Sequence, residues 1–505
     1  MMGRQPKVQN KLFYTAINLE QRVRQNHILR KIKPTIDFDF IYNEVKDKYG
    51  INGNESVAPP IILKMMLLLI FYNVRSEREL VLTIPERIDW LWFLDYDLDD
   101  DIPNHSVLSK ARARWGVEAF KTFFERIVWQ SVQAGLVDGS ELFMDSSMVQ
   151  ADASNNSVVN KQSLKRYLNT SYQILESRLE EEQKFSDSDQ QSKSGAANRK
   201  YISTTDPDAS VTRRGKGKSK LKYQVHRGVD QKCEVITATE VTPGEVHESH
   251  RLESLVDNHE KNTEITVETV VADSKYGSLE NYLACQDRDI QAHFSSLEQT
   301  QQGSGTKKGI FAKEAFSYNA ATDTFTCPAG QTLKKRRFYK KRQHYEYVAV
   351  AGTCNRCQLK TQCTKAKSGR TLKRHVRQDD LDSMLKQASS PESKKDIGTR
   401  QHLMERTFAQ ATRYGYQRAR WRRLWRVQIQ EYLTAAIQNI KILLKDVKEP
   451  APALEMQVTT EVSDKASRTK PNGRSNLFNP QWNDIAGFCF TPEKLLVHHH
   501  TAIIG

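Results

Sequence analysis

Apolar residues in the N-terminal part of the chain recur at helical spacing. An apolar run over 61–72 follows Pro59 and a second proline, and proline is favoured in the first turn of a helix. Ser76–Glu79 has the sequence of a capping box, which predicts the start of the next helix. Apolar residues three or four positions apart predict a further helix over 117–134. We therefore expect residues 1–136 to be mainly helical.

After residue 137 the pattern changes to alternating strands and helices. The first strand is a short apolar run that ends in an acid, Asp145, as a buried strand does at its functional end. A later β-branched run ends in a second acid, Asp273. The expected fold class is therefore α/β. The predicted strands are 141–145, 221–229, 235–240, 264–272 and 290–295, and the predicted helices are 247–260 and 278–286.

Two long stretches interrupt this alternation. Residues 155–215 begin with leucines that suggest an amphipathic helix over 164–179, and a polar stretch that we expect to be mobile follows. Residues 296–395 are basic and rich in cysteine, and helices are predicted after them at 400–412 and 424–446. The expected organisation is a helical N-terminal region (1–136), the first part of the core (137–295), a cysteine-rich insertion (296–395), the C-terminal helices of the core (396–447) and a disordered tail (448–505).

Composition is that of a globular chain and argues against a membrane-spanning one. The 505 residues suffice for about three domains at roughly 150 residues each. The longest apolar run has 12 residues, whereas a membrane-spanning helix needs about 20. The segment Met1–Pro6 lacks the apolar region of a signal peptide, so we expect a cytoplasmic protein.

The charge balance points to a polyanionic partner. The chain has 76 Lys and Arg against 61 Asp and Glu, which gives a net charge of +15 and an isoelectric point near 9.3. Such a surplus fits nucleic acid or an acidic membrane surface. Basic faces on the short helices of 1–136 suit a region that binds DNA or dimerises, and a plain helical subdomain fits equally well.

The strongest basic stretch interleaves arginine with aromatic residues and contains no acid. Arginine binds phosphate with two donors, and aromatic rings stack on unpaired bases. The alternative interpretation is a solvated charged face. The candidate nucleic-acid contacts are Arg413, Arg418, Arg420, Trp421, Arg422, Arg423 and Arg426, with Arg336 and Arg337 from a second basic stretch.

Three acids stand out by their positions. Asp145 and Asp273 each end a predicted strand, and Glu405 lies on the predicted helix 400–412. Hard divalent cations such as Mg²⁺ prefer oxygen ligands, and two such ions about 4 Å apart can activate a water and stabilise a leaving 3′ oxygen. The alternative is that each aspartate only caps a helix or forms a turn.

Four cysteines within 37 residues suggest a metal site. They are Cys327, Cys354, Cys357 and Cys363, and the middle two form a C-x₂-C pair. In a cytosolic chain, thiols of this kind indicate metal ligands rather than disulfides. Four thiolates suit a tetrahedral structural Zn²⁺. The alternative is four reduced thiols without a metal.

Three segments resemble, in chain order, the acidic motifs of bacterial insertion-sequence transposases of the DDE class. Met144–Ala153 resembles the first-Asp motif, and Val271–Gly277 resembles the second. Glu405–Phe408, followed by Arg420–Arg423, resembles the Glu segment. The similarity spans roughly residues 55–445, because Val74–Leu80 and Ser203–Ala209 also match.

The sequence departs from this group at two positions near the glutamate. The group often has an Arg four residues before the Glu and a Lys seven residues after it, where this chain has Gln401 and Thr412. Arg400 and Arg413 each lie one residue away.

The resemblance implies a fold, a reaction and partners. It implies an RNase H-like mixed-sheet core in which Asp145, Asp273 and Glu405 hold two Mg²⁺ or Mn²⁺ ions. It implies hydrolysis at the ends of a mobile element, then attack of the freed 3′-OH on target DNA. The implied partners are terminal inverted repeats, target DNA and further copies of the chain, in a homodimer or larger synaptic assembly associated with the nucleoid. A subgroup of these enzymes carries a similar cysteine cluster.

Two alternatives remain open from the sequence. One is an inactive DNA-binding protein descended from such an enzyme, in which the acids serve as structural caps. The other is a metal-dependent nuclease that cuts DNA without joining strands.

Overall fold

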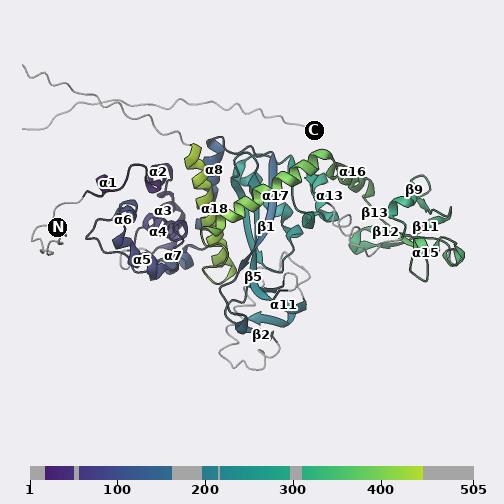
Figure 1. Ribbon diagram of the computed structural model, residues 1–505, viewed down its shortest axis with the longest axis horizontal. Helices are drawn as coiled ribbons and strands as arrows, with labels where there is room; N and C mark the ends of the chain where they lie inside the picture. The colour runs from purple at the N-terminus through teal and green to yellow at the C-terminus, as the bar shows by residue number, and fades with distance from the viewer. Residues whose placement is uncertain (1–17, 51–55, 162–195, 214–216, 296–309, 447–505) are drawn as a thin grey trace, which may run out of the picture. The chain divides into compact units, whose positions relative to one another are not determined.

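The chain forms a mixed α/β structure in which N-terminal helices precede a mixed sheet (Figure 1). The computed structural model describes residues 18–50, 56–161, 196–213, 217–295 and 310–446. The predicted amphipathic helix over 164–179 and the predicted tail 448–505 lie outside these residues. None of the described helices is both long enough and apolar enough to cross a membrane.

The N-terminal helices begin where the sequence signals place them. Helix α4 starts at Pro59, and the Ser76 side chain accepts a hydrogen bond from the Glu79 amide at 3.1 Å, which caps α5. The predicted helix over 117–134 is α8. The helices are α1 (Leu19–Arg22), α2 (Ile28–Thr35), α3 (Phe40–Val45), α4 (Pro59–Phe71), α5 (Glu77–Thr83), α6 (Ile88–Leu94), α7 (Ser106–Trp115) and α8 (Glu118–Gln133).

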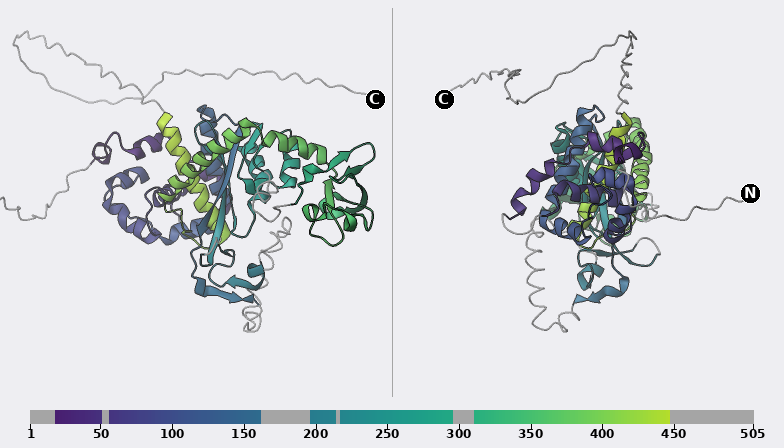
Figure 2. Two further views of the ribbon diagram at one scale, coloured as in Figure 1. Left: turned by 45° about the vertical axis from the view of Figure 1, so that its right-hand side comes forward. Right: turned by 90° about the vertical axis from the view of Figure 1, so that its left-hand side faces the viewer.

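Six of the described strands form the main sheet. Strand β1 (Glu141–Gln150) pairs with β5 (Lys220–Asp230) in antiparallel fashion, and β5 pairs on its other edge with β4 (Ser210–Thr212) and β6 (Ile236–Pro243). On its opposite edge β1 is parallel to β7 (Thr269–Val271), which is parallel to β8 (Gln291–His293). The two long strands β1 and β5 lie side by side (Figure 1), and Figure 2 shows the molecule from two further sides.

Four predicted strands have wrong boundaries: β6 runs on to Pro243, β8 covers only Gln291–His293, and β1 and β7 differ most from the prediction. Strand β1 continues to Gln150, so Asp145 lies within the strand rather than at its end, because β5 supplies a pairing partner as far as Lys222. The predicted strand over 264–272 shortens to the three residues of β7. Its first part is lost because the preceding helix runs to Thr263 and is ended by Glu264 in the left-handed conformation, with φ of 59°.

Alternation along β1 divides the core between the two faces of the sheet. Leu142 and Met144 join a cluster with α12 (Leu252–Thr263), α13 (Leu279–Asp287) and α16 (Gln378–Ala388). Phe143 belongs to the cluster that contains residues of α17 (Pro391–Thr412) and α18 (Leu424–Asp446). The predicted helix over 400–412 is the second half of α17. That helix starts earlier than predicted, at Pro391, where the Ser390 side chain caps it.

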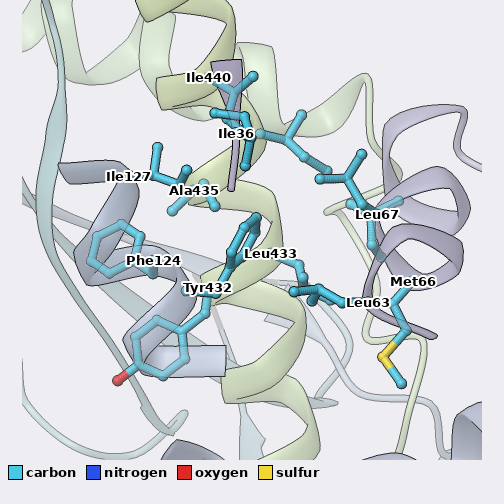
Figure 3. Close-up of a cluster of buried hydrophobic side chains, with 14 of the residues drawn as sticks. Ile36, Leu63, Met66, Leu67, Phe124, Ile127, Tyr432, Leu433, Ala435 and Ile440 are labelled. Carbon is cyan, nitrogen blue, oxygen red and sulfur yellow. The ribbon is translucent and has the colours of Figure 1, made fainter. Parts of the chain in front are cut away.

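Helix α18 joins the N-terminal helices to the rest of this core. Figure 3 shows Tyr432 and Leu433 of α18 among side chains of α4 and α8. The rings of Phe124 and Tyr432 stack with their centroids 5.6 Å apart. The predicted helix over 424–446 is therefore a core helix, because its apolar residues are buried.

A second, five-stranded antiparallel sheet lies within the cysteine-rich segment. Its strands are β9 (Ser317–Asn319), β10 (Thr324–Thr326), β11 (Thr332–Tyr339), β12 (His344–Val348) and β13 (Thr371–His375). Its own small core is built around Phe316, Phe325, Leu333, Tyr347 and Leu372. Two further pairing strands, β2 (Val158–Asn160) and β3 (Tyr201–Ser203), and the short helix α11 (Ala196–Lys200) lie in the predicted insertion 155–215.

Candidate active site

Asp145 occupies the middle of β1 and is held by two partners. Its Oδ1 accepts a hydrogen bond from the Ser146 amide at 2.7 Å. Its Oδ2 accepts from Nη1 of Arg400, on α17, at 2.9 Å. The Arg400 side chain is only 8% exposed, and its Nε has no hydrogen-bond partner among the described residues. The positively charged guanidinium group of Arg400 thus pairs with one oxygen of the Asp145 carboxylate.

Asp273 follows the strand that is parallel to β1. The last pair in that register is Phe143 with Val271, and Asp145 and Asp273 each come two residues later. Asp273 accepts a hydrogen bond from the Ser274 amide at 2.6 Å and caps the 3-10 turn η5 (Ser274–Tyr276). The prediction that a strand delivers this acid is confirmed, although that strand is short. The negative charge of Asp273 raises the pKa of Asp145, so the two carboxylates lie near one another, and we call them the acidic pair.

The surroundings of the acidic pair disfavour the ionised form of Asp145. Burial raises the pKa of Asp145, and the Arg400 guanidinium opposes this shift. The negative charges of Glu248 and Asp273 raise the pKa of Asp145 further. Tyr276 is fully buried nearby, and its hydroxyl has no partner among the described residues. The protein therefore disfavours the negatively charged form of Asp145 more than water does at the surface. A divalent cation bound to the carboxylate would stabilise that charged form.

Glu405 is not part of this pair in the structure. It lies on an exposed face of α17, and its Oε1 accepts a hydrogen bond from Gln401 Nε2 at 3.2 Å. Within the described part of the chain, no group of three or more His, Cys, Asp or Glu side chains is arranged to hold a metal ion. The structure thus brings Asp145 and Asp273 together and leaves Glu405 outside.

Two residues near the acidic pair were missed by sequence reasoning. Arg400 was noted only as one residue away from a motif position, yet it contacts Asp145 directly. Glu248 begins the 3-10 turn η4 (Glu248–Arg251) after β6 and is 5% exposed. The signal that pointed to Asp273, an acid close after a strand, does not single out Glu248, because Glu245 lies nearer to the end of β6.

The four candidate zinc ligands line one small cavity of about 30 Å³. Burial raises the pKa of the Cys363 thiol, and the charges of Cys327, Cys354 and Cys357 add to this effect. A tight turn holds Cys327, whose Sγ accepts from the Gln331 amide at 3.3 Å. The four thiols converge, but the described residues do not form a metal-holding group in the positions seen.

The candidate DNA contacts divide into exposed and packed residues. Arg413, Arg418 and Arg422 are exposed, and the last two pair with Asp152 at 2.8 and 3.3 Å. Arg423 lies 3.6 Å from Asp208, and Arg426 lies over the ring of its neighbour Trp425. On β11, Arg337 is exposed beside the ring of Tyr339, and the 66% exposed side chain of Arg336 lies 3.8 Å from Glu346.

Two of these candidates have structural partners instead. Arg420 donates to the Val74 carbonyl and to the Asn73 side chain, and burial lowers its pKa. Trp421 donates to Glu77 at 3.2 Å, and the buried Arg112 guanidinium lies 4.0 Å from the centre of its ring. These contacts connect the basic stretch to the N-terminal helices.

Two protein-family models match the chain. One is described as "Transposase domain (DUF772)" and matches residues 17–114, which contain helices α1 to α6 and nearly all of α7. The other is described as "Transposase DDE domain" and matches residues 326–444, which contain the four cysteines, α17 and most of α18. Asp145 and Asp273 lie between the two matches. No curated protein matches the chain.

Proposed function

We propose that this chain cuts the ends of its element and joins them to target DNA. The premise is that it is an insertion-sequence transposase of the DDE class. The observation that carries the proposal is the acidic pair: Asp145 on β1 is partly buried, and its pKa is raised by burial and by the charge of Asp273, which follows the neighbouring parallel strand β7. Transposases of this class generally use divalent cations such as Mg²⁺. The mixed sheet that carries both acids also supports an RNase H-like core.

The acidic pair fits a divalent cation by the chemistry of its ligands. Two carboxylates in one place leave room for water and phosphate oxygens on Mg²⁺ or Mn²⁺. When two ions are bound, they supply an activated nucleophile and stabilise the leaving oxygen of the phosphoryl transfer. Asp145 and Asp273 would hold the first ion between them. Arg400 would then give up the Asp145 oxygen, and its guanidinium is placed to contact a scissile phosphate.

Glu405 is proposed as the third carboxylate. It lies five residues after Arg400 on α17, about 7.5 Å further along the helix axis at 1.5 Å per residue. Its side chain is exposed, and its contact is with Gln401, a neighbour on the same helix. At about 100° per residue, Glu405 lies about 140° around the helix from Arg400, so reaching the acidic pair requires α17 to rotate or shift as well as the loss of this hydrogen bond.

Exposed arginines near the end of β1 are proposed to hold the DNA backbone. Asp152, the partner of Arg418 and Arg422, lies two residues beyond the end of β1, the strand that carries Asp145. Phosphate can compete for both guanidinium groups, because ion pairs at the surface are worth little. Arg413, Arg423 and Arg426 belong to the same stretch, and Arg336 and Arg337 form a second contact on β11. Two ends must be held at once, so we propose a homodimer or a larger assembly on the terminal repeats.

The cysteine cavity is proposed to hold a structural Zn²⁺ through Cys327, Cys354, Cys357 and Cys363. Their convergence on one cavity supports this assignment. A small movement of each side chain would satisfy the roughly 2.3 Å zinc–sulfur distance. The ion would hold the loops of the five-stranded sheet together.

The test is a joining assay on DNA that carries the element's own ends. Purified protein is incubated with Mg²⁺, a fragment ending in the terminal repeat and a plasmid target, and both cut and joined products are quantified. The proposal expects joined products that depend on the terminal repeat. Cutting without joining would show a nuclease, and binding without cutting would show an inactive DNA-binding descendant.

A further inference from the structure

Glu248 is a buried carboxylate that the proposed function does not use. It is 5% exposed, and one of its oxygens has two donors. Oε1 accepts from Gln224 Nε2 at 2.8 Å and from Lys275 Nζ at 2.7 Å. Oε2 is buried without a hydrogen-bond partner among the described residues. Burying a carboxylate with an unmatched oxygen costs free energy, so the position calls for an explanation beyond packing.

Both partners of Glu248 lead directly to the acidic pair. Gln224 also donates to Ser146 Oγ at 2.7 Å, and Ser146 is the residue after Asp145. Lys275 lies in η5, two residues after Asp273. Glu248 therefore links the strand that carries the first acid to the turn that carries the second.

Glu248 makes this link beyond the last paired residues of β1 and β7, where strand pairing no longer fixes the distance between the two acids. The pairing of β1 with β7 ends at Phe143 and Val271, two residues before the acids. Beyond that point, the separation of the two carboxylates depends on side-chain contacts and on the turn η5. A cation held between two carboxylates is sensitive to that separation, and partners that orient ligands typically change metal affinity by 10–100-fold.

We propose that Glu248 is a positioning residue that sets the separation of Asp145 and Asp273 and so tunes their affinity for a divalent cation. The inference rests on the proposed function, because it requires a cation at the acidic pair. Glu248 acts through Gln224 and Lys275.

Mn²⁺ binding to the full-length, DNA-free protein tests the inference without any activity assay. Glu248→Met removes both hydrogen bonds at similar volume, and we expect the Kd for Mn²⁺ in calorimetric titration to rise about 10–100-fold. Glu248→Gln keeps one acceptor oxygen and should rescue part of the loss. The matched control is Glu240→Gln on β6, whose partners are Arg251 and Ser254 rather than neighbours of the acids. This control should bind Mn²⁺ as the wild type does.

A second variant covers the case in which the Glu248 variants fail to fold. Lys275 is half exposed, so Lys275→Met removes the same link from the surface side. Positioning predicts weaker Mn²⁺ binding by this variant. Simple electrostatics predicts the opposite, because a positive charge leaves the neighbourhood of the acids. Unchanged affinity in Glu248→Met, or tighter binding by Lys275→Met, would overturn the inference.

Failure of the inference and failure of the proposed function give different results. Wild-type protein that binds no Mn²⁺, or Asp145→Asn protein that binds it normally, contradicts both. Loss of binding in Asp145→Asn together with unchanged binding in Glu248→Met contradicts the positioning role alone.

Discussion

At the scale of single residues, Asp145 is a partly buried carboxyl group whose ionised form the protein disfavours. Its burial disfavours the negative charge, and the Arg400 guanidinium compensates only in part, since the pKa remains raised. A carboxyl whose pKa is raised by folding contributes stability below its unfolded pKa and loses it as pH rises through the folded value. The protein therefore carries a cost at neutral pH that a cation at the proposed site would remove.

The first prediction concerns this cost. Asp145→Asn should leave the free energy of unfolding of metal-free protein at pH 7.5 unchanged or raise it, because the amide keeps the shape without the buried charge. Urea unfolding of wild type and variant at pH 7.5 and pH 5 measures the difference, which should shrink at the lower pH. A loss above about 2 kcal/mol at pH 7.5 would mean that the ion pair with Arg400 dominates.

The sequence singled out the two aspartates of the candidate site but not their surroundings. An acid after an apolar, β-branched run was enough to find Asp145 and Asp273. Their adjacency could not be derived, because it depends on the parallel register of strands more than a hundred residues apart. Arg400 and Glu248 reach the site through side-chain contacts across elements, for which a single sequence carries no direct signal.

At the scale of elements, helix and strand identities followed the hydrophobic pattern better than their boundaries did. Helices α8 and α18 were predicted almost to the residue, because both have regular apolar spacing and defined ends. The length of strand β7 was overestimated, because β-branched residues after Glu264 look like a strand until the helix end is taken into account.

The tyrosines of the basic stretch, Tyr414 and Tyr416, are core residues, since both are about 5% exposed or less.

The second prediction concerns the cysteine-rich sheet. Freshly purified, reduced protein should contain about one Zn²⁺ per chain, and Cys354→Ser should lower that content. The variant should also loosen β9–β13 in hydrogen exchange while β1 and β5 stay protected, because the small sheet has its own core. The matched control is Cys233→Ser, outside the cluster. Zinc-free protein by metal analysis would leave the four thiols as reduced cysteines.

The third prediction concerns the contact between Trp421 and the N-terminal helices. Trp421→Ala should lower the free energy of unfolding by about 1–3 kcal/mol, because it removes packing and the cation–π contact with Arg112. Thermal and urea unfolding measure this loss. A variant that is as stable as wild type but selectively loses DNA with unpaired ends would instead support base stacking by Trp421.

At the scale of the whole molecule, α18 and the basic stretch couple the N-terminal helices to the core that carries the acids. Helix α18 makes apolar contacts with α4 and α8, and Arg420 and Trp421 donate hydrogen bonds to the N-terminal helical region. The net charge of +15 then provides a general attraction for DNA. Charge and fold class were readable from composition and pattern, whereas this coupling required the structure.

The fourth prediction concerns how the whole molecule holds DNA. Each neutralised phosphate contributes about −0.9 to the slope of log K against log salt. Replacing Arg422 and Arg423 by Gln should flatten that slope by up to roughly two units and weaken specific and random duplexes alike. Binding isotherms at several salt concentrations measure the slope. If the double variant keeps both affinity and slope, the DNA path runs elsewhere.

The central claim is that Asp145 and Asp273 form the metal-dependent centre that cleaves DNA. The most direct measurement is Mg²⁺-dependent cleavage of terminal-repeat DNA by wild type, Asp145→Asn and Asp273→Asn, with DNA binding measured in the same samples. Asp138→Asn, an exposed aspartate just before β1, serves as the matched control. We predict that both active-site variants bind DNA normally and fail to cleave it, while the control cleaves as the wild type does. Wild-type cleavage by either active-site variant would contradict the account.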